Sequence, residues 1–98
     1  MRVKILDPAE KDLEDGYLFY ERQSQGLGSY FLDSLYSDID SLAYFGGIHS
    51  IHFGHYRALA KRFPYAIYYH ILEDTVLVKA ILDCRREPSW TRKNLASD

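Results

Sequence analysis

The side chains best suited to chemistry in this chain of 98 residues lie in its second half. An apolar run, VLVKAILDC (76–84), ends in two adjacent arginines, Arg85 and Arg86, and the only tryptophan, Trp90, follows shortly after. Guanidinium groups bind phosphates and carboxylates through paired hydrogen bonds, and tyrosine and histidine rings stack on bases. This segment therefore offers groups that suit an anionic ligand.

Alternation of apolar and polar residues predicts three strands here, over residues 56–62, 65–71 and 75–84. One face carries the core residues Tyr65, Ile67, Tyr69, Ile71, Val76, Val78, Ala80, Leu82 and Cys84. The opposite, uncovered face receives Arg57, Leu59, Lys61, Ala66, Tyr68, His70, Lys79, Asp83 and Arg85. We expect an anion or target site made of Arg57, Lys61, Tyr68, Lys79, Arg85 and Arg86. The alternative is that Arg85 and Arg86 form ordinary surface ion pairs with Asp83 or Glu87.

The charge distribution supports a working face in the second half. Residues 1–48 hold four Lys and Arg against nine Asp and Glu, whereas residues 49–98 hold eight against five. An acidic half joined to a basic half is typical of a protein with one surface for an anionic partner, although both halves could equally serve as solvated surface.

Other candidate sites are weaker. His49, His52 and His55 are three residues apart, but the surrounding GGIHSIHFGHY has no helical pattern, so we expect neither a metal nor a cofactor. Cys84 has core parity and is predicted to be a packed thiol. The acids of the second helix, Asp33, Asp38 and Asp40, are predicted to be solvated.

These residues are positioned by the elements of one α+β domain, residues 1–98, in the order β-α-α-β-β-β. RVKIL reads as a short strand, and DPAEKDLEDGYLFYERQ as a helix with Asp7 as N-cap, Pro8 in the first turn and a capping box completed by Glu10. Gly16 is predicted to allow close approach of a second element. The second helix carries an apolar stripe of Leu27, Phe31, Leu35, Ile39 and Leu42, with Ser34, Ser37, Asp38 and Ser41 opposite. The two helices form an antiparallel hairpin on one face of a mainly antiparallel sheet, and a short C-terminal helix begins near Pro88.

The sequence predicts a cytoplasmic protein that does not associate with membranes. It has no apolar run near the roughly 20 residues that span a bilayer, and its N-terminus lacks the apolar segment of a secretory signal. A single cysteine agrees with a reducing compartment.

The chain resembles the RelE/ParE superfamily, the toxins of bacterial type II toxin–antitoxin systems, often labelled plasmid stabilisation proteins. The resemblance rests on AEKDLEDGYLFYE (9–21), GLGSYFLDSL (26–35) and the segment 56–90, above all on Arg57, Phe63-Pro64-Tyr65, Tyr69 and the ending Arg85-Arg86-x-Pro88-x-x-Trp90. It implies a helical hairpin on a small antiparallel sheet, and a toxin that inhibits growth until a cognate antitoxin neutralises it.

The resemblance leaves the target open. RelE-like members cut mRNA in the ribosome, whereas ParE-like members inhibit DNA gyrase. Arg57 and Arg85 match functional basic positions of the RelE-like enzymes, and with His70 they are the candidate catalytic residues. Leu59 and Ala66 stand where further basic residues would be expected, and Trp90 and Thr91 stand near a missing C-terminal tyrosine. RNA cleavage needs a base, a phosphate clamp and an acid, so the pattern favours ParE-like gyrase inhibition. The alternatives are a RelE-like nuclease and a non-toxic module that only binds an antitoxin.

The resemblance also implies a hetero-oligomer with an antitoxin whose acidic C-terminal segment wraps the toxin. The predicted contacts are the apolar side chains that the inward stripes do not use, Leu18, Phe19 and Tyr30, together with Arg85 and Arg86.

Overall fold

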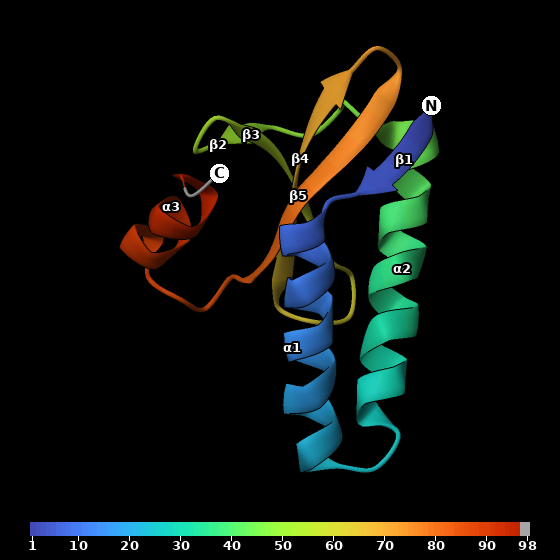
Figure 1. Ribbon diagram of the computed structural model, residues 1–98, viewed down its shortest axis with the longest axis vertical. Coiled ribbons are helices and arrows are strands. Elements are labelled where there is room, and N and C mark those ends of the chain that lie inside the picture. Colours follow the sequence, from blue (N-terminus) through green and yellow to red (C-terminus); the bar gives the residue numbers. More distant parts are fainter. Residues whose placement is uncertain (97–98) are drawn as a thin grey trace.

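The computed structural model describes residues 1–96 of the chain (Figure 1). In chain order the elements are β1 (Arg2–Ile5), α1 (Asp7–Gln23), α2 (Leu27–Phe45), β2 (Ile51–His52), β3 (His55–Leu59), β4 (Tyr65–Leu72), β5 (Thr75–Asp83) and α3 (Pro88–Ala96). The predicted α+β class, helical hairpin and short C-terminal helix are confirmed. The strand β2 was not predicted, because a run of two residues is too short to display alternation.

The strands form one sheet in the order β1-β5-β4-β3-β2. β1 is parallel to β5, and the other neighbours are antiparallel. Both tight hairpins turn on two residues with positive φ, Phe53-Gly54 (54° and 79°) and Glu73-Asp74 (49° and 63°). Two left-handed residues in succession match the twist of the flanking strands, which is why such turns close antiparallel hairpins.

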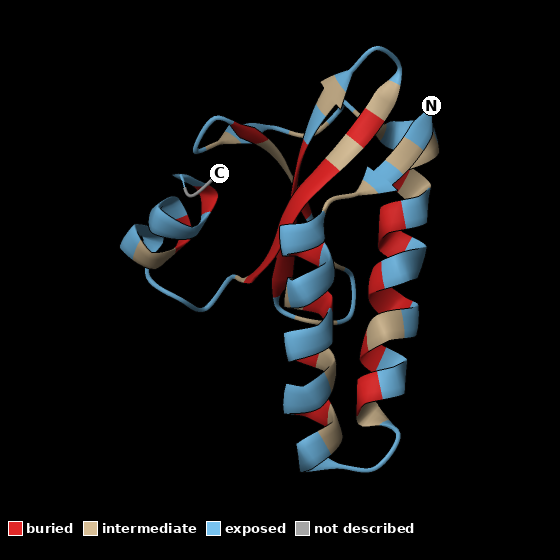
Figure 2. Cartoon of the chain, viewed as in Figure 1, coloured by how far each residue is buried: buried red, intermediate tan, exposed pale blue. Residues whose placement is uncertain are grey.

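The helical hairpin covers one face of this sheet (Figure 2). The predicted stripe of α2 is buried at Phe31, Leu35, Ile39 and Leu42. The rings of Tyr20, Phe63 and Tyr65 surround Phe31, each with its centroid 5.1 Å from that of Phe31. Burial of these apolar side chains, at about 25 cal/mol per Å², is the main force that holds the helices on the sheet.

Two glycines let α1 and α2 approach closely. A Cβ on Gly16 would lie 2.5 Å from Cζ of Phe31, and one on Gly28 would lie 2.6 Å from the carbonyl oxygen of Tyr17. The predicted role of Gly16 is therefore confirmed, and the helix propensity that a glycine loses is offset by packing that a larger residue would prevent.

The start of α1 differs from the prediction. Leu6 is the N-cap residue, Asp7 already belongs to the helix, and no side chain caps the first turn. The reason is the strand before it: the Leu6 N–H donates to the Val78 carbonyl, and the Leu6 carbonyl accepts from the N–H groups of Ala9 and Glu10. The chain thus passes directly from sheet to helix, and no residue remains outside to form a capping box.

The polar side of α2 was also predicted incorrectly. Ser34 and Asp38 are buried, at 4% and 8% exposure. Oδ2 of Asp38 accepts a hydrogen bond of 3.0 Å from the backbone N–H of Lys61, which fixes the segment between β3 and β4 on the helix. A buried carboxylate that binds a backbone N–H is stable where a solvated one was expected.

A β-bulge at Lys79 changes which side chains of β5 face the helices. Tyr68 pairs with Ala80 but Tyr69 pairs with Val78, so Lys79 is an extra residue in β5. An extra residue reverses the alternation beyond it. The predicted core parity therefore holds for Val76 and Val78 but is wrong for Ala80, Leu82 and Cys84.

The face opposite the helical hairpin, hereafter the far face, is not uncovered as predicted. α3 lies on this side of β4 and β5, across the sheet from α1 and α2 (Figure 1). It forms a second apolar cluster with the sheet, made of Ala66, Tyr68, Ala80, Leu82, Leu95 and Trp90. None of the helices within residues 1–96 is long and apolar enough to span a lipid bilayer.

Candidate functional site

Three predicted anion-binding side chains, Arg57, Tyr68 and Arg86, border one cavity on the far face. The cavity has a volume of about 160 Å³ and is completed by His52, Phe53, Cys84, Pro88 and Thr91. Arg57 and Tyr68 are brought together as paired residues of β3 and β4. Burial raises the pKa of the Tyr68 hydroxyl, and the nearby Arg57 guanidinium opposes that rise.

The Arg57 guanidinium keeps binding capacity in this cavity. Its Nε atom is buried and has no hydrogen-bond partner within residues 1–96. An unpaired buried donor is costly, so a carboxylate or phosphate oxygen that reached Nε would be stabilised strongly. The predicted position of Arg57 beside Tyr68 on one face is confirmed, whereas its role stays a prediction.

His70 and Lys79 lie at the other end of the far face. The His70 ring stacks on His55 with centroids 4.2 Å apart. Burial, His55 and Lys79 all lower the pKa of His70, which favours its neutral form. Lys79 itself is 8% exposed because it occupies the bulge. The neutral form of His70 adds no positive charge to the face, and Lys79 is buried at the bulge.

Lys61 does not lie in the predicted row. β3 ends at Leu59, and the chain then turns onto α2, where Lys61 borders a cavity with Asp38, Leu42 and Phe45. The alternation of side chains along β3 would place Lys61 on the far face only if the strand continued to residue 62. The bond between the Lys61 N–H and Asp38 ends the strand earlier.

Arg85 also lies away from the far face, because the bulge reverses the parity of the residues after Lys79. Its guanidinium donates two hydrogen bonds to the Asp83 carboxylate, at 2.9 and 2.8 Å, and Oδ1 of Asp83 also accepts the Arg85 N–H. These bonds lower the pKa of Asp83 and raise that of Arg85. Arg85 lies close enough to Tyr20 in α1 to influence its pKa. The alternative of an ordinary ion pair with Asp83 is thus the arrangement observed.

Arg86 stacks on Trp90, with Cζ 4.1 Å from the ring centroid. A cation over an indole face gains about 0.5–2 kcal/mol, depending on solvation, and here the contact joins the segment between β5 and α3 to α3 itself. The stack separates the far-face cavity from a second concave region, because Arg86 borders both.

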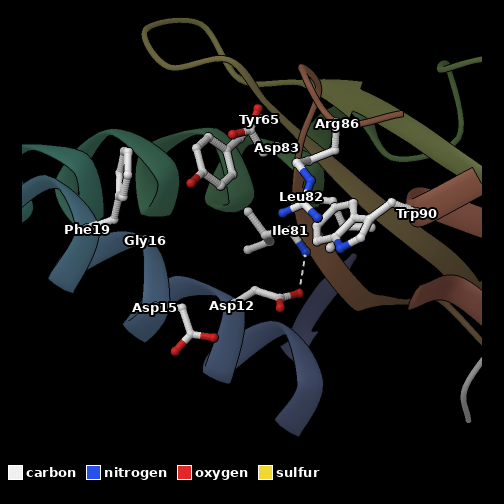
Figure 3. A pocket seen from close by; sticks show the side chains of 10 residues that line it. All are labelled: Asp12, Asp15, Gly16, Phe19, Tyr65, Ile81, Leu82, Asp83, Arg86 and Trp90. Atoms are coloured by element: carbon white, nitrogen blue, oxygen red, sulfur yellow. Dashed lines mark hydrogen bonds between the residues drawn. The ribbon is translucent and has the colours of Figure 1, made fainter. Parts of the chain in front are cut away.

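This second region, the α1–α3 cleft, has a volume of about 260 Å³ (Figure 3). Its lining residues are Asp12, Asp15, Gly16, Phe19, Tyr65, Ile81, Leu82, Asp83, Arg86 and Trp90. Figure 3 shows Asp12 and Asp15 on the α1 wall and the Arg86–Trp90 stack on the opposite wall. One wall of the cleft is therefore acidic, the other carries a cation, and the surface between them is largely apolar.

Asp12 is the most perturbed carboxylate of the cleft. Burial raises its pKa to about 6, although the hydrogen bond that its Oδ2 accepts from the Ile81 N–H, at 2.9 Å, opposes the rise. Asp15 raises the pKa further, and Lys11 lowers it. Ionised Asp12 is thus a partly desolvated anion with only one backbone donor shown.

Asp12→Asn is expected to change how the stability of the protein depends on pH. The folded chain holds the Asp12 proton up to about pH 6, but the unfolded chain releases it near the ordinary aspartate pKa of 3.8. This group therefore makes stability fall as pH rises from about 4 to about 6. Asparagine keeps an oxygen for the Ile81 N–H and does not titrate. In urea unfolding, the variant should therefore gain stability relative to the native chain across this interval. A stability difference between the two proteins that does not vary with pH would contradict the raised pKa of Asp12. Asp83, whose pKa is lowered, makes the opposite contribution, but it does so equally in both proteins and therefore cancels.

The predicted antitoxin contacts Leu18, Phe19 and Tyr30 are exposed, at 40%, 48% and 49%. Phe19 borders the α1–α3 cleft with Arg86, whereas Tyr30 packs its ring against Phe63, 5.5 Å away. Larger apolar exposure occurs where α2 ends, at Tyr44 and Ile48. The structure thus brings Phe19 and Arg86 to one cleft, and their role in binding stays a prediction.

His49, His52 and His55 each hydrogen-bond a different residue, and Cys84 is a free thiol on the far face. Nδ1 of His49 bonds the Tyr69 hydroxyl, His52 bonds Ser50, and His55 donates from Nδ1 to the Phe53 carbonyl. Within residues 1–96 no three His, Cys, Asp or Glu side chains are grouped so as to hold a metal ion. Cys84 is exposed rather than packed, since the bulge places it on the far face, and partial burial raises the pKa of its thiol.

The α1–α3 cleft was missed at the level of the sequence. Its one available signal was the helical position of Asp12, one turn before the buried Gly16 and beside the buried Leu13. A carboxylate at the border of an apolar stripe is partly desolvated. The sequence could not reveal that β1 stops at Ile5 and leaves the Ile81 N–H for this carboxylate.

The fold and these surfaces define a small α+β class: a helical hairpin on one face of a mainly antiparallel sheet, with a short C-terminal helix on the other face. A chain of the chromosomal ParDE toxin–antitoxin (TA) system from P. aeruginosa has this fold, with a TM-score of 0.69 at 18% sequence identity, over 83% of this chain and 92% of that one. The fold implied by the RelE/ParE resemblance is therefore confirmed. No protein-family model matches the sequence, and no curated protein matches it either.

Proposed function

We propose that the protein is the toxin of a bacterial type II toxin–antitoxin module of the RelE/ParE kind, acting in the cytoplasm and neutralised by a cognate antitoxin. The observation that carries this proposal is the likeness of fold to a ParDE chain over most of both chains. The sequence segments that resemble the superfamily cover the same hairpin and sheet, which supports the proposal independently.

Within this superfamily we favour a ParE-like toxin that inhibits DNA gyrase. The two positions where a RelE-like enzyme would carry further basic residues are Leu59 and Ala66. Ala66 is buried in the apolar cluster beneath α3, where a charged side chain would be desolvated. A phosphate clamp built from these positions is therefore absent from the described far face.

A ribosome-dependent mRNA endonuclease is the second candidate, and Arg57 is the observation that favours it. Its unpaired Nε could bind the scissile phosphate, and neutral His70 could accept a proton. A non-toxic module that only binds an antitoxin is the third candidate, because the fold is compatible with binding alone.

Induced alone in bacteria, the protein should arrest growth, and co-expression of the neighbouring gene should restore it. Purified protein should then inhibit gyrase supercoiling and leave ribosome-bound mRNA intact. Cleavage of mRNA at codon boundaries would reject the ParE-like assignment in favour of the nuclease. Normal growth at good soluble expression would contradict the toxin proposal and leave the binding module.

A further inference from the structure

β5 has a free edge beyond its pairing with β1. β1 pairs with β5 only as far as Val78, and the Leu6 N–H makes the last bond of this edge, to the Val78 carbonyl. Beyond the bulge no strand of the described chain lies beside β5 on this side. Here the edge faces the α1–α3 cleft instead of another strand.

Asp12 occupies the place that a neighbouring strand would take. In a β-ladder the N–H groups of an edge residue bond the carbonyls of the adjacent strand. The Ile81 N–H instead donates to the Asp12 carboxylate across the cleft (Figure 3). Since alternate residues of a strand point their backbone groups the same way, the Ile81 carbonyl and the Asp83 N–H are also directed toward the cleft. An edge of this kind can accept an additional strand.

The charges of the cleft select the kind of segment that can enter. Asp12 and Asp15 line one wall, and the only ion pair shown for either is the exposed one between Lys11 and Asp15. A second acidic group near Asp12 would be repelled, whereas a lysine or arginine would replace the solvation that burial removes. Phe19 and Trp90 offer apolar surface beside it, and Arg86 on the opposite wall suits an acid elsewhere in the same segment.

We propose that the α1–α3 cleft binds an extended segment of the antitoxin, which pairs with β5 through the Ile81 carbonyl and the Asp83 N–H and places a lysine or arginine side chain against Asp12. This inference rests on the proposed function and specifies the chemistry of the partner: a predominantly acidic wrapping segment must carry a cation where it crosses this cleft.

Binding of such a cation must be linked to the protonation of Asp12. The charged and titratable groups around it are Lys11 and Asp15 on α1, Tyr65 on β4, and Asp83 and Arg86 at the end of β5. Free Asp12 titrates near pH 6, and a cationic partner would favour its ionised form. Affinity should therefore rise between about pH 5 and pH 7, by about tenfold for each unit by which the complex lowers the pKa.

The test is calorimetric titration of the full-length antitoxin, the product of the adjacent gene, into the native protein, Asp12→Asn and Glu14→Gln at pH 5.5, 6.5 and 7.5. Glu14 is the matched control, because it lies on the same helix but borders the groove toward α2. Asp12→Asn should bind about tenfold more weakly at pH 7.5 and lose the rise with pH; Glu14→Gln should behave like the native protein. Amide hydrogen exchange at Asp83 should slow in the complex.

The outcomes separate this inference from the proposed function. Tight antitoxin binding with the same affinity and pH profile in Asp12→Asn and the native protein would overturn the cleft as the cation site and leave the toxin assignment standing. Unchanged exchange at Asp83 in a tight complex would overturn the strand pairing. Failure of the antitoxin to bind any of the three proteins would contradict the proposed function itself, and the inference with it. Dimerisation through this cleft without antitoxin would replace the partner by a second copy.

Discussion

Leu35→Ala is expected to lower the free energy of unfolding by about 2–5 kcal/mol. Leu35 is fully buried at the centre of the stripe that α2 presents to the sheet. Truncation loses the transfer free energy of three carbons and leaves a cavity that the neighbours fill only in part. A domain of this size is stable by about 5–15 kcal/mol, so the loss is a large fraction of the total.

Urea unfolding of the two proteins measures this difference, and Leu18→Ala is the matched control. Leu18 is 40% exposed on α1, so its truncation should cost less than about 0.5 kcal/mol. Equal losses in the two variants would show that the hairpin is not held on the sheet by the α2 stripe. A small loss for Leu35→Ala alone would mean that α2 moves to close the cavity.

The sequence predicted the stripe of α2 because the period of 3.6 is strong there and the neighbouring glycines define both ends. It also predicted the helical hairpin, since only Ser24, Gln25 and Gly26 separate the helices. Local signals of this kind need no knowledge of distant residues. The same holds for the antiparallel strands β4 and β5, which are joined by Glu73-Asp74 alone.

The site was predicted less well, because its geometry depends on contacts between distant residues. The bulge at Lys79 exists only in the pairing of β5 with β4, yet it decides that Arg85 meets Asp83 and Tyr20 rather than the far face. Asp38 likewise ends β3 from a helix 23 residues away, which removes Lys61 from the row. Counting alternate residues along one strand cannot predict the bulge or the early end of β3, because both depend on contacts with other elements.

These corrections narrow the set of residues that could contact the target of the proposed toxin directly. Arg85 is hydrogen-bonded to the Asp83 carboxylate, Arg86 lies over the Trp90 ring, and Lys79 is buried at the bulge. Of the predicted anion-binding residues, Arg57 is the arginine whose buried Nε lacks a partner within residues 1–96. The basic surface is therefore not a row along the sheet; instead, Arg57 and Arg86 border one cavity that Pro88 and Thr91 of α3 also line.

Arg57→Ala is expected to abolish growth arrest, so that colony counts after induction return to those of cells carrying an empty vector. The physical reason is that Arg57 borders this cavity with a buried Nε that has no hydrogen-bond partner within residues 1–96. Because the side chain is half-buried, the variant should lose about 1 kcal/mol of stability and remain folded, which urea unfolding checks.

Arg62→Ala, at an exposed arginine between β3 and β4, is the control and should stay toxic. Arg57→Lys keeps the charge but not the paired N–H donors of the guanidinium, so it should arrest growth less strongly if those paired donors bind the target. Full toxicity of folded Arg57→Ala would place the target contact elsewhere, on the helical hairpin or the α1–α3 cleft.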